Sequence, residues 1–190
     1  LADGGYRLGV AIADVSHFVS QGDPIDQEAL LRGTSVYIPG KTIPMLPERL
    51  SNGLCSLRPH EDRLAKIAWM DLDESGDFQE IRLEKSVIRS AQRFTYEEAQ
   101  SILDGDSAPG IDPKLIDQIQ TLNHLREVLL QRRLRQGALQ LEIEEMKLVL
   151  DEEGEVVDVV SREHLAAHSL VEECMLAANE AVATYASQQE

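Results

Sequence analysis

Residues 63–90 read RLAKIAWMDLDESGDFQEIRLEKSVIRS and contain two strand-like runs, 63–72 and 78–90, separated by the acidic segment DESGD at 73–77. Apolar and β-branched residues bounded by Asp, Ser and Gly predict a β-hairpin. The turn lacks the ligand spacing of a calcium-binding loop, so its simplest interpretation is a solvated loop. This stretch therefore predicts two antiparallel strands joined by a short exposed turn.

A third strand is predicted at residues 6–14, YRLGVAIAD, which lie between Gly-Gly and Val-Ser-His. Its carboxyl end places Asp14, Ser16 and His17 above the sheet. Asp14 and His17 are candidates for an acid/base pair or for metal ligands, because sheets often carry functional groups at strand ends. The alternative is a turn in which Asp14 caps backbone amides.

The segment between these strands predicts smaller elements. A short helix at 26–32 ends at Gly33, and residues 34–39 are strand-like. Residues 39–61 contain several prolines and no periodicity, which predicts an ordered irregular loop. We expect this loop to pack through its apolar residues Ile43, Met45, Leu46, Leu50, Leu54 and Leu57.

Helices dominate the second half of the chain. Thr95 is a predicted N-cap of a helix that ends at Leu103, and leucines and isoleucines at helical spacing predict a long helix at 114–135. A second hairpin is predicted from 141–150 and 156–160, and a final helix from 165–186. Strands and helices mix without regular alternation, so the predicted fold class is α+β. The final helix should place Leu170, Cys174, Ala177 or Ala178, and Val182 on one face.

The charge of the chain bears on its partners. The net charge of −16 by itself argues against a nucleic-acid surface, since phosphate contacts use Lys and Arg. The acidity lies mostly in residues 91–190, which carry 8 basic and 20 acidic residues, whereas residues 1–90 carry 10 and 14. The composition is therefore compatible with an RNA enzyme but does not indicate one.

Composition also excludes several classes of protein. No run of about eighteen apolar residues is present, so no membrane span is expected. Cys55 and Cys174 form no Cys-x-x-Cys motif and have no neighbouring His, so we expect buried thiols in a cytoplasmic protein rather than a disulfide, a zinc ribbon or a nucleophile. Glycine-rich phosphate-binding loops are also absent from the sequence.

Two further groups of residues are candidates for binding. His164, His168 and Glu172 recur every four residues on one helix face, a spacing that can present metal ligands but that also occurs on ordinary surface helices. Tyr37, two residues after Ser35, and Tyr96, directly after Thr95, each lie near a turn or cap, where a ring can stack on a base or can pack half-buried. These alternatives remain open from the residues alone.

Six segments of the chain form a recognisable pattern: VAIADVSHF (10–18), RGTSVYIP (32–39), IPMLPERLSNGLCSL (43–57), DRL (62–64), SVI (86–88) and LVEECMLAAN (170–179). In their order and spacing they resemble the ribonuclease II/ribonuclease R family, whose catalytic domain is the RNB domain. The resemblance extends over essentially all of residues 1–190, and the amino-acid sequence of these segments is closer to the ribonuclease R branch. It implies an α+β mixed sheet with flanking helices.

The resemblance implies a processive exoribonuclease that hydrolyses single-stranded RNA from its 3′ end and releases nucleoside 5′-monophosphates with Mg²⁺. The family's Asp cluster and its transition-state arginine have no counterpart in residues 1–190, so these residues are expected to be an internal part of the domain that is inactive alone and holds no certain metal ligand. The expected partner is single-stranded RNA, with no DNA or membrane.

The resemblance also assigns RNA contacts. Tyr37 matches a tyrosine that stacks near the 3′ end, Tyr96 matches a second tyrosine near the RNA path, and Glu172 matches a glutamate at the terminal nucleotides. Leu141 replaces the phenylalanine that clamps the last base, which puts the aromatic clamp in doubt. Asp14 and His17 lie in the IADVSH segment and are expected to support the site or to contact RNA.

Two alternatives differ in kind from this enzyme. One is a relative of the same fold that binds RNA without cleaving it. The other is an acidic protein-interaction domain, which only the charge of residues 91–190 favours.

Overall fold

The computed structural model describes residues 1–190 except 2–3, 39, 140–144, 152–153, 163 and 190. The predicted hairpin forms as β4 (Asp62–Leu72) and β5 (Phe78–Arg89), and β1 (Tyr6–Ala13) pairs with the other edge of β4. All pairings in this sheet are antiparallel, with the order β1–β4–β5. Together with the helices that cover it, this sheet confirms the α+β class.

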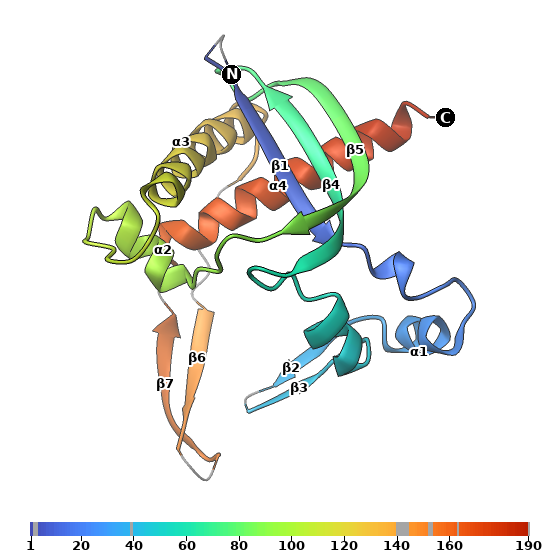
Figure 1. The fold of residues 1–190 in the computed structure, drawn as a ribbon. Coiled ribbons are helices and arrows are strands. Elements are labelled where there is room, and N and C mark those ends of the chain that lie inside the picture. The colour runs from blue at the N-terminus through green and yellow to red at the C-terminus, as the bar shows by residue number, and fades with distance from the viewer. Residues whose placement is uncertain (2–3, 39, 140–144, 152–153, 163, 190) are drawn as a thin grey trace.

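Helices cover one face of the sheet. α4 (Ala166–Ser187) crosses all three strands and packs beside α3 (Pro113–Arg135), while α2 (Tyr96–Leu103) contacts both helices (Figure 1). Alternate residues of β1 and β4 point to the helices, and small residues of α4 allow its close approach to the sheet. The buried core consists of Leu8, Ala68, Met70, Leu72, Leu125, Leu129, Ala177, Ala178 and Ala181.

One residue of the apolar face predicted for the last helix lies outside the core. Val182 is 45% exposed, whereas Ala181 is fully buried. A helix advances about 100° per residue, so Ala181 lies almost in line with Cys174 and Val182 is turned well away from it. Cys174 packs against the core, and burial raises the pKa of its thiol to about 11. The half-buried Cys55 also has a raised pKa, and both thiols are free.

The acidic turn at 73–77 is not simply a solvated loop, contrary to the prediction. Gly76 is buried against α3 with φ +83°, and a Cβ there would lie 3.0 Å from Cγ1 of Val128. Asp77 accepts a hydrogen bond from Nε of Arg132 at 2.9 Å. Asp73 accepts from the backbone N–H groups of Ser75 and Asp77 at 2.8 and 3.1 Å. The turn therefore fastens the hairpin to α3.

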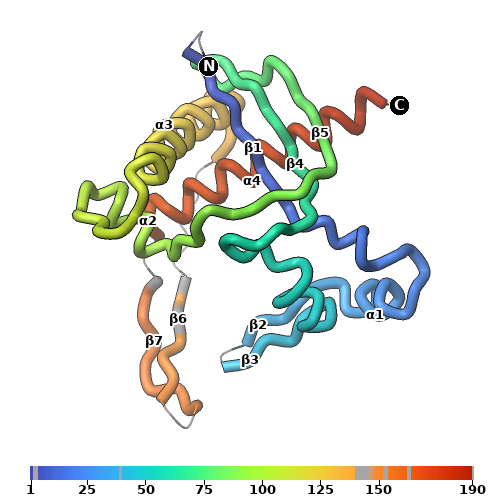
Figure 2. Tube along the Cα trace, viewed as in Figure 1, coloured from blue at the N-terminus to red at the C-terminus, as the bar shows by residue number. Residues whose placement is uncertain are grey.

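A smaller unit lies below the sheet in Figure 2. It contains α1 (Pro24–Arg32), β2 (Val36–Ile38), β3 (Lys41–Ile43) and a π-helical segment, Arg49–Leu54. The expected irregular loop at 39–61 was therefore wrong, because β3 pairs with β2 across a turn in which Gly40 adopts φ +73°. Leu50 is buried as expected, whereas Ile43 and Leu54 are exposed.

The second predicted hairpin forms as β6 (Glu145–Leu150) and β7 (Val156–Arg162) and projects from the rest of the molecule (Figure 1). Its predicted first residues lie outside the described part of the chain. A short 3₁₀ turn, Val15–His17, follows β1. Among the described residues, no helix is long and apolar enough to cross a membrane.

Candidate nucleic-acid interface

Tyr96 is held at the start of α2 by a capping box. The backbone N–H of Thr95 donates to Oε2 of Glu98 at 2.8 Å, and the Oγ1 of Thr95 accepts from the backbone N–H of Glu98 at 3.2 Å. These bonds satisfy two otherwise unpaired donors and fix where the helix begins. The predicted N-cap is thus confirmed, and it places the first side chain of the helix, that of Tyr96, at the junction of α2 with α4.

The ring of Tyr96 stacks on the ring of His168 from α4. Their centroids are 4.1 Å apart with an interplanar angle of 25°, and the ring of His164 lies 5.5 Å from that of His168. A hydrogen bond also joins the two helices: the backbone N–H of Ala167 in α4 donates to Oε1 of Gln100 in α2 at 3.1 Å. The pattern in the sequence indicated the histidine pair but missed its tyrosine partner, which lies far away in the chain.

Glu172 and Glu173 point in different directions on α4. Glu173 is 3% exposed and binds Arg133 of α3 through two bonds of 2.9 and 2.6 Å, whereas Glu172 is exposed. Hydrogen bonding to Glu173 raises the pKa of Arg133, with a smaller contribution from the charge of Glu172. The arrangement leaves the Glu172 carboxylate free to meet a ligand one helical turn beyond His168.

Asp14 does not cap the turn that follows β1, so the capping alternative was wrong. Its buried carboxylate accepts a hydrogen bond from Oγ of Ser16 at 2.7 Å and lies 3.4 Å from Nζ of Lys66. The bond from Ser16 lowers the pKa of Asp14, with Lys66 adding to the effect. His17 is exposed, and its ring meets the edge of Phe18.

The described residues do not fit a metal site. Within them, no group of three or more His, Cys, Asp or Glu side chains could hold an ion. Asp14 is engaged by Ser16 and Lys66, and His168 is engaged by Tyr96. Because the resemblance assigns Glu172 to RNA, we predict that His164, His168 and Glu172 bind no zinc, which elemental analysis of the purified protein would test.

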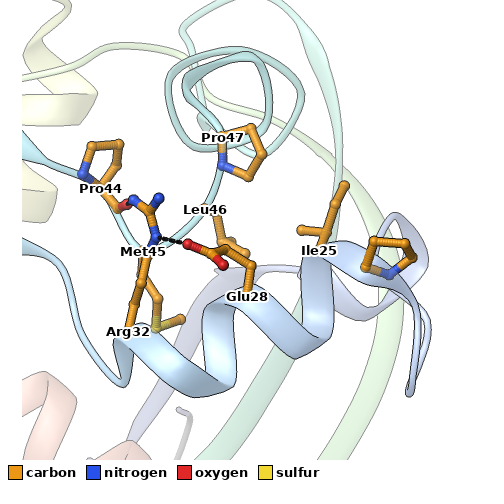
Figure 3. Close-up of a pocket in the computed structure, with 8 residues that line it drawn as sticks. Ile25, Glu28, Arg32, Pro44, Met45, Leu46 and Pro47 are labelled. Atoms are coloured by element: carbon orange, nitrogen blue, oxygen red, sulfur yellow. Dashed lines mark hydrogen bonds and ion pairs between the residues drawn. The ribbon is translucent and has the colours of Figure 1, made fainter.

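Tyr37 lies on β2, whereas Tyr96 begins α2 and Glu172 lies on α4, and Figure 1 shows β2 apart from both helices. Its side chain is 78% exposed, so it contributes little to packing. The hairpin that carries it is fastened to α1, because Nη1 of Arg32, the last residue of α1, donates to the carbonyl of Pro44 at 2.8 Å. Within α1, Nε of Arg32 donates to Oε1 of Glu28 at 2.9 Å. Figure 3 shows these side chains around a mainly apolar hollow of about 280 Å³ between α1 and residues 44–47.

The ends of the two small hairpins approach each other. A Cβ added to Gly40, in the turn after β2, would lie 3.7 Å from Cδ1 of Leu150 at the end of β6. The exposed ring of Tyr37 is therefore carried by a hairpin whose turn approaches the β6–β7 hairpin. Leu141, the predicted replacement for the clamping phenylalanine, lies outside the described residues.

Comparison with known proteins decides the family. A sequence model of the RNB domain matches residues 1–190. This chain belongs to the RNB domain family. The predicted resemblance is thereby confirmed, and the match of this RNB domain extends from one end of the chain to the other.

Curated and structural relatives agree with that assignment. The RNB domain is 45% identical to ribonuclease R of Thermotoga maritima over 184 residues, which are 96% of this chain and 26% of the relative. It superimposes on Mycoplasma genitalium RNase R in complex with ribose-methylated single-stranded RNA with a TM-score of 0.93 at 33% identity, over 96% of this chain and 29% of the other. The chain spans about a quarter of the length of the curated relatives it matches.

A more distant likeness concerns the fold alone. Yeast Ssd1, described as a pseudonuclease, matches 90% of this chain and 20% of its own with a TM-score of 0.66 at 18% identity. The RNB fold therefore also occurs in a protein that is not described as an active nuclease.

Proposed function

We propose that the full-length protein carrying this RNB domain is an exoribonuclease that degrades single-stranded RNA processively from the 3′ end and releases nucleoside 5′-monophosphates. The observation that carries the proposal is the match to proteins named ribonuclease R over 96% of the chain. It is supported by the likeness to Mycoplasma genitalium RNase R structures that contain single-stranded or double-stranded RNA.

Four side chains supply the RNA contacts in this proposal, and three of them, those of Tyr37, Tyr96 and Glu172, are exposed in the structure. Tyr37 stacks on a base near the 3′ end, as the family resemblance implies, and its exposed ring on β2 is open to such a base. Tyr96 stacks or packs along the RNA, and Glu172 accepts hydrogen bonds from ribose hydroxyls, which DNA lacks at the 2′ position. Leu141 offers apolar contact in place of an aromatic clamp.

Asp14 and His17 have supporting roles in the proposal. The pairing of Asp14 with Ser16 and Lys66 orders the end of β1 and keeps the carboxylate ionised. The exposed ring of His17 is then available to the RNA backbone. Mg²⁺ is proposed to bind carboxylates of the full-length protein outside the described residues, since the described ones do not fit a metal.

The direction of degradation tests this function. With full-length protein and Mg²⁺, a 3′-labelled single-stranded RNA should release labelled mononucleotide at once. The same RNA labelled at its 5′ end should keep its label on RNA until a short end product remains. A single-stranded DNA of the same sequence serves as the control and should persist. Internal fragments or loss of the 5′ label first would contradict the proposal, and RNA that is bound but intact would indicate the non-catalytic alternative.

A substitution at Tyr37 tests its stacking role in the full-length protein. Tyr37→Ala should lengthen the smallest undigested fragment, because base stacking contributes roughly 1 to 3 kcal/mol per base and a short product has few other contacts. Breakdown of long RNA should slow much less, since an interaction shared by ground and transition states affects binding more than kcat. The size of fragments is read on a denaturing gel.

Tyr37→Phe is the matched control, because it keeps the ring and removes only the hydroxyl. The fragment pattern of this variant should resemble that of the unmodified protein. If Tyr37→Ala leaves the fragments unchanged, or abolishes hydrolysis of long RNA with folding intact, the stacking role is wrong.

A further inference from the structure

The stacked rings of Tyr96 and His168 lie at the junction of α2 and α4, and the His168 ring is restrained there by a hydrogen bond. His168 is the third residue of α4, and its Nδ1 accepts a hydrogen bond from the backbone N–H of Leu165 at 3.1 Å. The neutral ring therefore carries its proton on Nε2. This bond restrains the torsion of the imidazole, so the face that it turns to Tyr96 is set by the backbone of α4.

Tyr96 is restrained from the opposite side. Its backbone position is fixed by the capping box of Thr95 and Glu98, and the bond from Ala167 to Gln100 ties α2 to the first turn of α4. Tyr96 is still 39% exposed although its ring lies 4.1 Å from that of His168. One part of the tyrosine is thus packed on a restrained ring while another part is open to a ligand.

We propose that His168 is a positioning residue that holds the Tyr96 ring in the orientation that receives RNA. The inference rests on the proposed RNA contact of Tyr96 and assigns a role to a neighbour that makes no contact with RNA itself. A ring that is already oriented loses less conformational freedom when a base or ribose packs on it. His168 therefore strengthens RNA binding through Tyr96.

His168 performs two separable tasks, and two substitutions divide them. His168→Phe keeps a flat ring that can stack on Tyr96 but loses the acceptor for Leu165. His168→Asn keeps an acceptor close to the position of Nδ1 but loses the ring. A purely structural role predicts that the phenylalanine variant is more impaired, whereas positioning predicts that the asparagine variant is.

The test measures the affinity of the full-length protein for a short fluorescent single-stranded RNA in EDTA, which prevents hydrolysis by removing divalent ions. His168→Asn should weaken binding roughly five- to tenfold, the lower end of what one stacked base contributes. His168→Phe should bind within about twofold of the unmodified protein, even though its melting temperature falls through loss of the cap. Tyr96→Ala should weaken binding at least as much as His168→Asn.

The double variant Tyr96→Ala/His168→Asn should bind no more weakly than Tyr96→Ala alone, because the two residues act through one ring. Additive losses would overturn the proposal, as would weak binding by His168→Phe with normal binding by His168→Asn. Normal binding by both His168 variants while Tyr96→Ala binds weakly would overturn it as well. If Tyr96→Ala itself binds normally while the protein still degrades RNA, the RNA contact of Tyr96 is wrong and this inference fails with it, but the proposed activity stands.

Discussion

The full-length protein should convert a labelled single-stranded RNA into mononucleotides with Mg²⁺, whereas residues 1–190 alone should release none. Metal-dependent phosphodiester hydrolysis requires carboxylates that converge on the ions at the scissile phosphate. The described residues contain no such cluster, and Asp14, the buried carboxylate at the end of β1, is engaged by Ser16 and Lys66. We therefore expect an all-or-none difference between the two proteins.

The comparison needs equal molar amounts of both proteins and one labelled oligonucleotide, with products resolved by thin-layer chromatography. Circular dichroism of residues 1–190 shows whether they are folded under the assay conditions. EDTA added to the full-length protein is the control for metal dependence and should stop the reaction. Mononucleotide release by residues 1–190 would show that the chemical centre lies within them.

Removal of Arg133 should have the largest effect on stability. Its guanidinium forms two hydrogen bonds with Glu173, whose carboxylate is almost completely buried between α3 and α4. Arg133→Met leaves that carboxylate without its partner, and an uncompensated buried charge costs about 3 to 5 kcal/mol. We expect the free energy of local opening of α4, measured by hydrogen exchange in the full-length protein, to fall by this amount.

A matched double variant separates the ion pair from the packing. Arg133→Met/Glu173→Met removes both charges and should recover most of the loss, because apolar residues of similar volume can replace a buried pair. Arg89→Met is the exposed control, since Arg89 and Asp62 pair at the open end of the sheet and both are well exposed. That variant should change hydrogen exchange little. If the double variant is no more stable than Arg133→Met, the loss of stability comes from altered packing of the side chains and not from the unpaired charge of Glu173.

Local signals in the sequence were sufficient for most of the secondary structure. Strand-like runs around turn residues predicted β4 with β5, and Thr95 followed by acidic residues predicted the start of α2. These signals depend on neighbours in the chain, so they can be read without a fold. The long segments shared with the ribonuclease II/ribonuclease R family likewise identified the RNB domain, which the match over residues 1–190 confirmed.

Short or weakly periodic segments were less predictable. β3 was expected to be irregular because three strand residues between prolines carry almost no periodic signal, and their pairing with β2 depends on the turn at Gly40. The acidic turn at 73–77 was expected to be solvated. Its five residues carry no local signal that Arg132 and Val128 of α3 lie against it.

The sequence by itself determined the fold class, the family and the identity of the candidate RNA contacts, since each is carried by contiguous residues. Only the tertiary structure decided which of those residues act together. It stacked Tyr96 on His168, paired Glu173 with Arg133 and left Glu172 exposed beside them. The physical reason is that these contacts form when α2, α3 and α4 pack against one another, and the distances between side chains on separate helices are set by packing rather than by spacing along the chain.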